Sequence, residues 1–232
     1  MACRGIVGFF SNGVTKGAYH HYDAQPTDLG IEVLNYLGQV DPASLEKRAQ
    51  IWMKETEPLK AGEESAKWEQ LQKFLDSDDK EVPAALKMDQ SVFLYQAGCE
   101  YAYIVNFDTK ELEIYQGPNY DPNQAGRYVK SPEAAFTQAN AHLQPYLEKW
   151  LARGASRKEA EKALRPVYGV RLVLTIPLTI NAEMKVKERN QLMACLEKVL
   201  LKLSNRREDK YIEAFAVLSE KYPDPAEDET DE

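Results

Sequence analysis

Cysteine is scarce in this chain of 232 residues, which contains only Cys3, Cys99 and Cys195. Their spacing matches no zinc motif and an odd number cannot all pair, so we expect reduced thiols in a reducing compartment. No stretch reaches the roughly 18 to 20 apolar residues of a membrane span. Residues 1–20 also lack the basic and apolar regions of a secretory signal. We therefore expect a cytoplasmic protein with no membrane partner.

The motifs of the large enzyme classes are missing as well. The chain has no phosphate-binding glycine loop, no dinucleotide fingerprint, no zinc-protease helix, no Gly-x-Ser-x-Gly elbow and no set of protein-kinase motifs. We therefore expect no cofactor and no bound metal.

An excess of basic residues is also absent. The net charge is −8 at pH 7, and six carboxylates lie within residues 224–232, so the rest of the chain is nearly neutral. A nucleic-acid partner needs clustered Lys and Arg to neutralise phosphates, and we expect none here. The length of the chain indicates a single domain over residues 1–222, followed by a disordered acidic tail over residues 223–232.

The most informative pattern that is present is a hairpin at the start of the chain. Two β-type runs, residues 5–10 and 14–19, flank the pair Asn12-Gly13. Asn and Gly tolerate the positive φ of a type I′ turn, so this pattern predicts two antiparallel strands.

Two later segments also have the pattern of strands. Alternation over residues 101–116 predicts a second hairpin. Residues 167–180 are apolar on both faces, which predicts a strand covered from two sides and central in the sheet up to Pro177. The segment 117–130 is rich in Gly, Pro, Asn and Asp and is typical of an exposed, functional loop.

Helices are predicted from apolar spacing and from capping residues. Thr27 and Asp41 can each cap a helix, and Ser156 with Glu159 forms a capping box. The predicted helices cover residues 27–38, 42–52, 63–75, 156–164, 192–203 and 211–222, with a further start at Ser131-Pro132. The expected fold is α+β, with antiparallel-rich sheets formed by residues 3–23, 92–116 and 167–180 and with helices on their faces.

Cys3 is the candidate nucleophile. N-terminal-nucleophile hydrolases use the free α-amino group of the first residue as the base for its own side chain, which would require Cys3 to become residue one. The alternative is that Cys3 is a small buried residue at the start of a strand, as most reduced cysteines are.

A resemblance to known families supports the first interpretation. Residues 3–8 resemble the Cys-Gly-Ile-Val-Gly opening of class II glutamine amidotransferases with Arg4 inserted, and residues 101–117 with the first hairpin are similar to the two hairpins of proteasome-type subunits. Both belong to the N-terminal-nucleophile (Ntn) hydrolase fold. The resemblance implies an Ntn-hydrolase-like αββα sandwich, in which Cys3 would attack amide bonds.

A second resemblance covers residues 3–30 and comprises Arg4-Gly5-Ile6-Val7-Gly8-Phe9, Asn12-Gly13, Lys16, Tyr19-His20-His21-Tyr22-Asp23-Ala24-Gln25-Pro26 and Leu29-Gly30. It resembles uncharacterised phage and bacterial proteins, in which an Arg-Gly start leads to a Tyr-Asn-His-Phe-Asp-Ser-Tyr-Pro-like motif and a Leu-Gly. His20 replaces the more frequent Asn of that family, Ala24-Gln25 replaces Ser-Tyr, and Cys3 replaces Thr. The motif implies no established activity.

The cluster His20-His21-Tyr22-Asp23 is the best site candidate apart from any resemblance. On a strand, the two histidines would point to opposite faces, so at most one could enter a given pocket and no metal site is expected. His21 and Asp23 would share a face and could form a carboxylate-oriented imidazole for base catalysis or binding. The alternative is that Asp23 caps the turn before Pro26 while one histidine packs in the sheet.

Two basic residues complete the candidate site. Arg4 and Lys16 lie at the same end or at opposite ends of the first hairpin depending on its register, and either could meet an anion or form a salt bridge. We infer a binding or regulatory protein for a small anionic molecule or a protein partner, with an amidohydrolase using Cys3 as the alternative. The candidate ligand-binding residues are Arg4, Lys16, His21, Tyr22 and Asp23.

Overall fold

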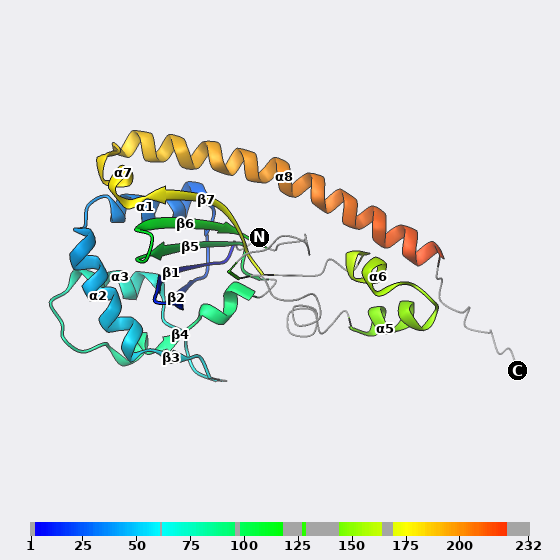
Figure 1. Cartoon of the computed structure of the whole chain (residues 1–232), viewed down its shortest axis with the longest axis horizontal. Helices are drawn as coiled ribbons and strands as arrows, with labels where there is room; N and C mark the ends of the chain where they lie inside the picture. Colours follow the sequence, from blue (N-terminus) through cyan, green and yellow to red (C-terminus); the bar gives the residue numbers. More distant parts are fainter. Residues whose placement is uncertain are drawn as a thin grey trace, which may run out of the picture.

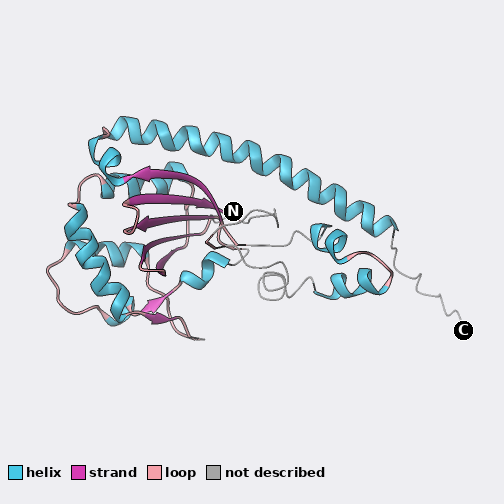
Figure 2. Ribbon diagram, viewed as in Figure 1, coloured by secondary structure: helices cyan, strands magenta, loops and turns pink. Residues whose placement is uncertain are grey.

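A computed structural model of the chain describes residues 3–60, 62–95, 98–117, 127–128, 144–163 and 169–221. Its centre is a five-stranded sheet with helices around it (Figure 2). The strands lie in the order β2 (Val14–His20), β1 (Gly5–Ser11), β5 (Tyr101–Asn106), β6 (Glu111–Gln116) and β7 (Arg171–Pro177). The sheet is mixed, because β1 pairs with β5 in parallel and all other pairs are antiparallel. The predicted α+β fold with antiparallel-rich pairing and an N-terminal hairpin is therefore confirmed.

The first hairpin forms as the sequence predicts. Strands β1 (Gly5–Ser11) and β2 (Val14–His20) are joined by Asn12 and Gly13, whose φ angles are +51° and +80°. Both residues thus have the positive φ that a type I′ turn needs. The Asn12 amide donates to both carboxylate oxygens of Asp108, each at 3.1 Å, which ties this turn to the turn of the second hairpin.

The second hairpin is also confirmed. It consists of β5 (Tyr101–Asn106) and β6 (Glu111–Gln116), paired from Tyr101↔Gln116 to Asn106↔Glu111. The connection between β1 and β5 is parallel and long, so residues 21–100 form a crossover that supplies helices to the sheet.

The last strand departs from the prediction. Strand β7 (Arg171–Pro177) pairs with β6 and is an edge strand, whereas a central strand was predicted. The side chain of Leu172 is 47% exposed, so the strand is not covered from both sides. The prediction was wrong because an apolar run reports burial on average and not the number of neighbouring strands.

The second sheet is small. Strands β3 (Glu57–Pro58) and β4 (Met88–Asp89) pair in parallel over two residues each. The described part of the chain therefore contains no second large sheet that could complete the αββα sandwich of the Ntn resemblance.

Helices occupy the segments between and after the strands. Along the chain they are η1 (Pro26–Gly30), α1 (Ile31–Leu37), α2 (Pro42–Glu55), α3 (Trp68–Asp76), η2 (Ala84–Leu86), η3 (Ser91–Tyr95), α5 (Gln144–Ala152), α6 (Arg157–Ala163), α7 (Leu178–Glu183) and α8 (Val186–Lys221). None of the described helices is both long enough and apolar enough to span a membrane.

Two of the three predicted caps are present. The Asp41 carboxylate accepts from the Ser44 amide at 2.8 Å, and Ser156 and Glu159 bond each other's amides as a capping box. The Thr27 cap was wrong, because the Thr27 hydroxyl and amide both bond the Glu197 carboxylate of α8. A contact 170 residues away in sequence thus takes the place of the local cap.

Two helix boundaries also differ from the prediction. The helix predicted over residues 63–75 begins later, at Trp68. The two predicted C-terminal helices are the single helix α8, because the polar segment between them contains neither Pro nor Gly to end it. The predicted helix start at Ser131-Pro132 and the acidic tail lie outside the described residues.

The sheet has a buried cluster on each face. The larger cluster joins alternate strand residues, Val7, Tyr103 and Ile114 among them, to residues of α1, α2, α3 and α8. The smaller joins Ile6 and Ile104 to the η3 helix and to residues near β7. Both faces of the central strands are thus covered.

Helix α8 connects two parts of the structure. Near its start it contacts η1 and α1 beside the sheet, and farther along it contacts α6. It extends well beyond the sheet toward α5 and α6 (Figure 1). Gly30 permits the close approach at η1, because a Cβ there would collide with the methyl group of Met193 on α8 and lie 3.0 Å from the Tyr103 ring.

Candidate functional site

A cleft of about 470 Å³ opens where β2 ends. Four segments line it: the end of β2 with the residues that follow, η1, the first turn of α1 and the first turn of α3. The lining residues are His20, His21, Tyr22, Asp23, Asp28, Leu29, Glu32 and Glu69.

Backbone contacts fix the segment that carries most of these residues. Asp23 turns the chain with a φ of +55°, a conformation that Asp and Asn adopt more readily than most residues. The next residue, Ala24, is fully buried, and its amide donates to the Cys3 carbonyl at 3.2 Å. The Ala24 carbonyl accepts from the Tyr103 hydroxyl at 2.9 Å. The segment that follows Asp23 is therefore held against Cys3 and the central strand β5.

Two of the four carboxylates in the cleft accept hydrogen bonds from the described chain. Glu32 accepts from the Trp68 indole at 2.8 Å, and Asp28 accepts from the Gln25 side-chain amide at 2.6 Å. Glu69 lies 3.1 Å from His20 Nδ1, although that buried nitrogen makes no hydrogen bond within the described chain.

The Asp23 carboxylate differs from the other three. No described side chain or amide donates a hydrogen bond to it, and the residue is exposed. Asp23 is therefore available to a ligand, as is the exposed Glu69.

Aromatic rings form the outer wall of the cleft. Tyr19 Oη lies 2.8 Å from His21 Nδ1, and the His21 and Tyr22 rings meet edge to face with centroids 4.1 Å apart. Tyr22 remains 60% exposed. Burial raises the pKa of the Tyr19 hydroxyl, and the nearby Arg4 charge partly opposes that rise.

The predicted relation between the two histidines was wrong. Both line the cleft, because β2 ends at His20 and the alternation of a strand does not extend to His21. The predicted pair of His21 and Asp23 is also replaced, since Tyr19 is the partner of the His21 ring.

Arg4 and Lys16 do not join the cleft. The register places Gly5 opposite His20 and Phe9 opposite Lys16, so Lys16 lies away from the cleft, whereas Arg4 lies at the cleft end of the hairpin. Arg4 stays outside the lining, and its side chain bonds the Tyr19 hydroxyl. Lys16 donates to the Thr56 carbonyl at 3.0 Å and lies 3.7 Å from the buried Asp89 carboxylate. Of the five predicted ligand-binding residues, the structure therefore brings together His21, Tyr22 and Asp23.

Cys3 lies in an environment that opposes nucleophilic chemistry. It precedes β1 and packs, partly buried, against the larger core cluster. Burial raises the pKa of its thiol to about 12, and the Glu100 carboxylate contributes to the rise. Reactive cysteines instead have lowered pKa values. The amidohydrolase alternative stays a prediction, with no support from these surroundings.

The charges of the cleft suit a cation. Its described lining contains four carboxylates, two imidazoles and no Lys or Arg. The carboxylates do not converge on one point, since no group of three or more His, Cys, Asp or Glu among the described residues could hold a metal ion. An elongated organic cation fits this distribution, because it can meet a carboxylate with its charge and an aromatic ring with its face. The small anionic ligand stays a prediction that this lining does not favour.

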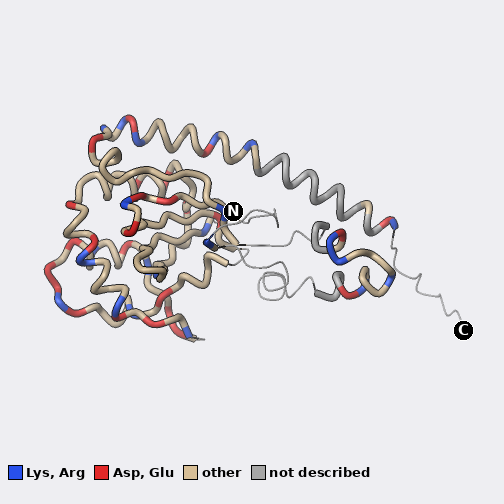
Figure 3. The backbone as a smooth tube through the Cα atoms, in the orientation of Figure 1, with Lys and Arg blue, Asp and Glu red and all other residues tan. Residues whose placement is uncertain are grey.

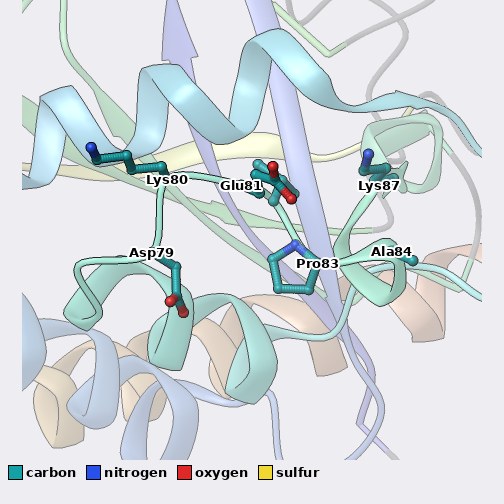
Figure 4. A pocket seen from close by; sticks show the side chains of 7 residues that line it. Asp79, Lys80, Glu81, Pro83, Ala84 and Lys87 are labelled. Carbon is teal, nitrogen blue, oxygen red and sulfur yellow. The ribbon is translucent and has the colours of Figure 1, made fainter.

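A second hollow provides a comparison. It measures about 650 Å³ and is lined by the segment before η2, by η2 itself and by Lys87 after it, with Asp79, Lys80, Glu81 and Lys87 spread around it (Figure 4). Acidic and basic side chains are balanced there, as they are along much of the described chain (Figure 3). The absence of basic residues from the lining of the first cleft is therefore a local property.

Sequence reasoning missed Asp28, Leu29, Glu32 and Glu69 as parts of the site. Glu32 and Glu69 sit in the first turns of α1 and α3, where acidic residues are common for the sake of the helix dipole. No local signal distinguishes such a carboxylate from one that lines a cleft.

Comparison of the chain with models of known protein families, with curated proteins and with solved structures finds no match. The resemblances to Ntn hydrolases and to phage and bacterial proteins therefore stay predictions.

Proposed function

We propose that this chain is a binding protein whose cleft takes a basic side chain of a protein partner. The observation that carries the proposal is the lining of the cleft. The described part of this lining contains four carboxylates and an exposed tyrosine, and it contains no Lys or Arg. A lysine or arginine side chain would pair its charge with Asp23 and lay its aliphatic part along Tyr22.

The openness of the site supports a macromolecular partner over a small metabolite. Small-molecule sites usually bury most of their ligand and are lined mainly by apolar side chains. Here Leu29 is the only aliphatic side chain in the described lining, and Tyr22 and Asp23 are exposed. One side chain in such a cleft binds weakly, so additional contacts from a partner surface would supply the affinity.

The test is a titration of the ¹⁵N-labelled chain with Nα-acetyl-lysine methylamide, followed by amide chemical shifts. We expect shifts at residues 20–24, 28–32 and 69, with a dissociation constant on the order of 1 to 10 mM for this single side chain. Inorganic phosphate, the matched anionic probe, should leave these amides unchanged.

Two charge-neutralising variants sharpen the test. Asp23→Asn removes a free carboxylate and keeps a residue that tolerates a φ of +55°, so it should weaken binding of the lysine probe several-fold. Glu81→Gln neutralises a carboxylate in the second hollow and should leave binding unchanged. If phosphate, and not the lysine probe, shifts the cleft amides, the proposed sign of the ligand is wrong. No shift with either probe would exclude the cleft as the site.

A reducing compartment such as the cytoplasm is part of the proposal. It is supported by Cys3, Cys99 and Cys195, all three of which are free thiols.

A further inference from the structure

One nitrogen of the His21 ring is already bonded within the chain. Tyr19 Oη lies 2.8 Å from His21 Nδ1, and Nε2 has no hydrogen-bond partner among the described residues. His21 is exposed and lines the cleft, so Nε2 is the polar atom of this ring that a ligand can reach. Whether Nε2 donates or accepts a hydrogen bond depends on which nitrogen carries the proton of the neutral ring.

Arg4 approaches the same tyrosine from the neighbouring strand. Because Gly5 pairs with His20, Arg4 lies at the end of the hairpin that carries Tyr19 and His21. The Arg4 amide donates to the Glu100 carboxylate at 3.3 Å, and the Arg4 carbonyl accepts from the Glu100 amide at 3.0 Å. The backbone from which the guanidinium extends is therefore fixed on both sides.

A phenylalanine ring brings the two side chains together. The Tyr19 ring packs edge to face against Phe93, with centroids 5.3 Å apart. The Arg4 guanidinium is close to the same ring, because a Cβ at Gly98 would lie 3.2 Å from both Arg4 Nη2 and Phe93 Cε2. There the guanidinium bonds the Tyr19 hydroxyl. A chain of hydrogen bonds thus runs from Arg4 through Tyr19 to the His21 ring.

The number of protons in this chain determines the state of the neutral His21 ring. A guanidinium can only donate, so the Tyr19 oxygen accepts from Arg4. A phenol has a single proton, and His21 Nδ1 is its acceptor within the described chain. With a proton on Nδ1, two donors would face the Tyr19 oxygen and the phenol proton would lose that acceptor. Every group is satisfied when Tyr19 donates to Nδ1 and the ring proton is on Nε2.

We infer that Arg4 is a positioning residue of the cleft, which acts through Tyr19 to keep His21 Nε2–H as a hydrogen-bond donor for the ligand. The ligand group that suits this donor is a main-chain carbonyl of the partner, next to the basic side chain that enters the cleft. The identity of this ligand group rests on the proposed function, whereas the state of the ring is a property of the chain alone. A peptide supplies both the cation and the carbonyl, and a simple alkylamine supplies the cation alone.

The first test is the ¹⁵N spectrum of the histidine ring nitrogens in the chain without ligand at pH 8, where an ordinary imidazole is neutral. For His21 we expect an unprotonated Nδ1 and a protonated Nε2. Arg4→Met and Tyr19→Phe each break the chain of hydrogen bonds, so the averaged shifts of His21 should move toward a mixture of the two tautomers. Arg4→Lys keeps a donor and should retain the native spectrum.

The second test compares two probes, Nα-acetyl-lysine methylamide and n-butylammonium, which share the cation and differ in the amide carbonyls. The native chain should bind the lysine probe about two- to tenfold more tightly, the range of a single hydrogen bond. In Arg4→Met and Tyr19→Phe this ratio should fall toward one. Removing the Arg4 charge acts in the opposite direction through long-range electrostatics, because it would strengthen the binding of both cations.

Lys80→Met is the matched control, since it removes an exposed charge from the second hollow. It should keep both the native ring spectrum and the native ratio of affinities. Circular dichroism establishes that each variant is folded, and because the two variants act on different ends of the hydrogen-bond chain, either one alone suffices.

Three results would overturn the inference: a proton on His21 Nδ1 in the native chain, a native ring spectrum in Arg4→Met and Tyr19→Phe, or an unchanged ratio of affinities in both variants. Absence of shifts with either probe on the native chain would instead be a failure of the proposed function. The ring spectra would then still decide whether Arg4 positions His21.

Discussion

Replacing Arg127 with Met should leave a carboxylate buried without its counter-charge. Glu113 on β6 is 5% exposed and accepts four hydrogen bonds. Two come from Arg127, at 2.6 and 3.0 Å, and the others come from Asn106 and Tyr115, each at 2.7 Å. The guanidinium also lies 3.7 Å from the centre of the Phe10 ring.

The magnitude follows from what remains after the substitution. Removing one partner of a buried ion pair costs about 3 to 5 kcal/mol, because the other charge stays desolvated. Arg127 is 30% exposed and its pairing is partly screened, so we expect a loss of about 3 kcal/mol in the free energy of unfolding. For a chain of 232 residues, this corresponds to a decrease in Tm of roughly 6 to 12 °C.

The double variant Glu113→Gln/Arg127→Met separates charge from packing. A neutral amide at position 113 keeps hydrogen-bonding capacity toward Asn106 and Tyr115 but has no charge to leave unpaired. The double variant should therefore be more stable than Arg127→Met alone, by about 1 to 2 kcal/mol. Urea denaturation monitored by tryptophan fluorescence measures all three proteins. A double variant no more stable than the single one would refute the reasoning from buried charge.

Three further predictions concern local features. In alkylation with iodoacetamide at pH 8, the exposed Cys195 should react before Cys3. The pKa of Cys3 is raised from 9.0 to about 12, so Cys3 should have about a thousandfold less thiolate than an ordinary thiol. Equal labelling of the two peptides in mass spectrometry would contradict this. Asn12→Ala should lower the free energy of unfolding by about 1 kcal/mol in urea, because a φ of +51° disfavours Ala, and an unchanged midpoint would refute the strain. The Ser44 amide lowers the pKa of the Asp41 carboxyl, so the stability that the Asp41 cap contributes is present above the unfolded-state pKa and is lost as pH falls through the folded-state pKa. The difference in Tm between the native chain and Asp41→Ala should therefore shrink from about pH 5 to about pH 2. A constant difference would show that charge plays no part in the cap.

Local features of the fold could be predicted because they depend on neighbouring residues. The Asn12-Gly13 turn, the Asp41 cap and the Ser156 capping box each need only a few consecutive side chains, and all three are present. The Thr27 cap failed for the opposite reason, since Glu197 on α8 competes for the same hydroxyl.

Strand order depends on partners far away in the sequence. The apolar composition of β7 suits a strand with neighbours on both sides as well as an edge strand, so it does not specify whether one or two strands flank it. The parallel pairing of β1 with β5 is equally remote, because it depends on how residues 21–100 fold back over the sheet.

The candidate site could likewise be predicted only in part, because its residues could be found from the sequence and its net charge could not. His21, Tyr22 and Asp23 could be found because they are consecutive and chemically unusual. The sign of their ligand could not, because it is decided by carboxylates that reach the cleft from η1, α1 and α3 and by Lys16, which the hairpin register places away from the cleft. Glu69 enters because residues 66–67, directly before α3, pair with β2 near its end. The contact that closes one edge of the sheet thus also completes the acidic cleft. It follows that mutations which loosen the Tyr19–Ala66 backbone pairing should weaken cation binding and expose the β2 edge together.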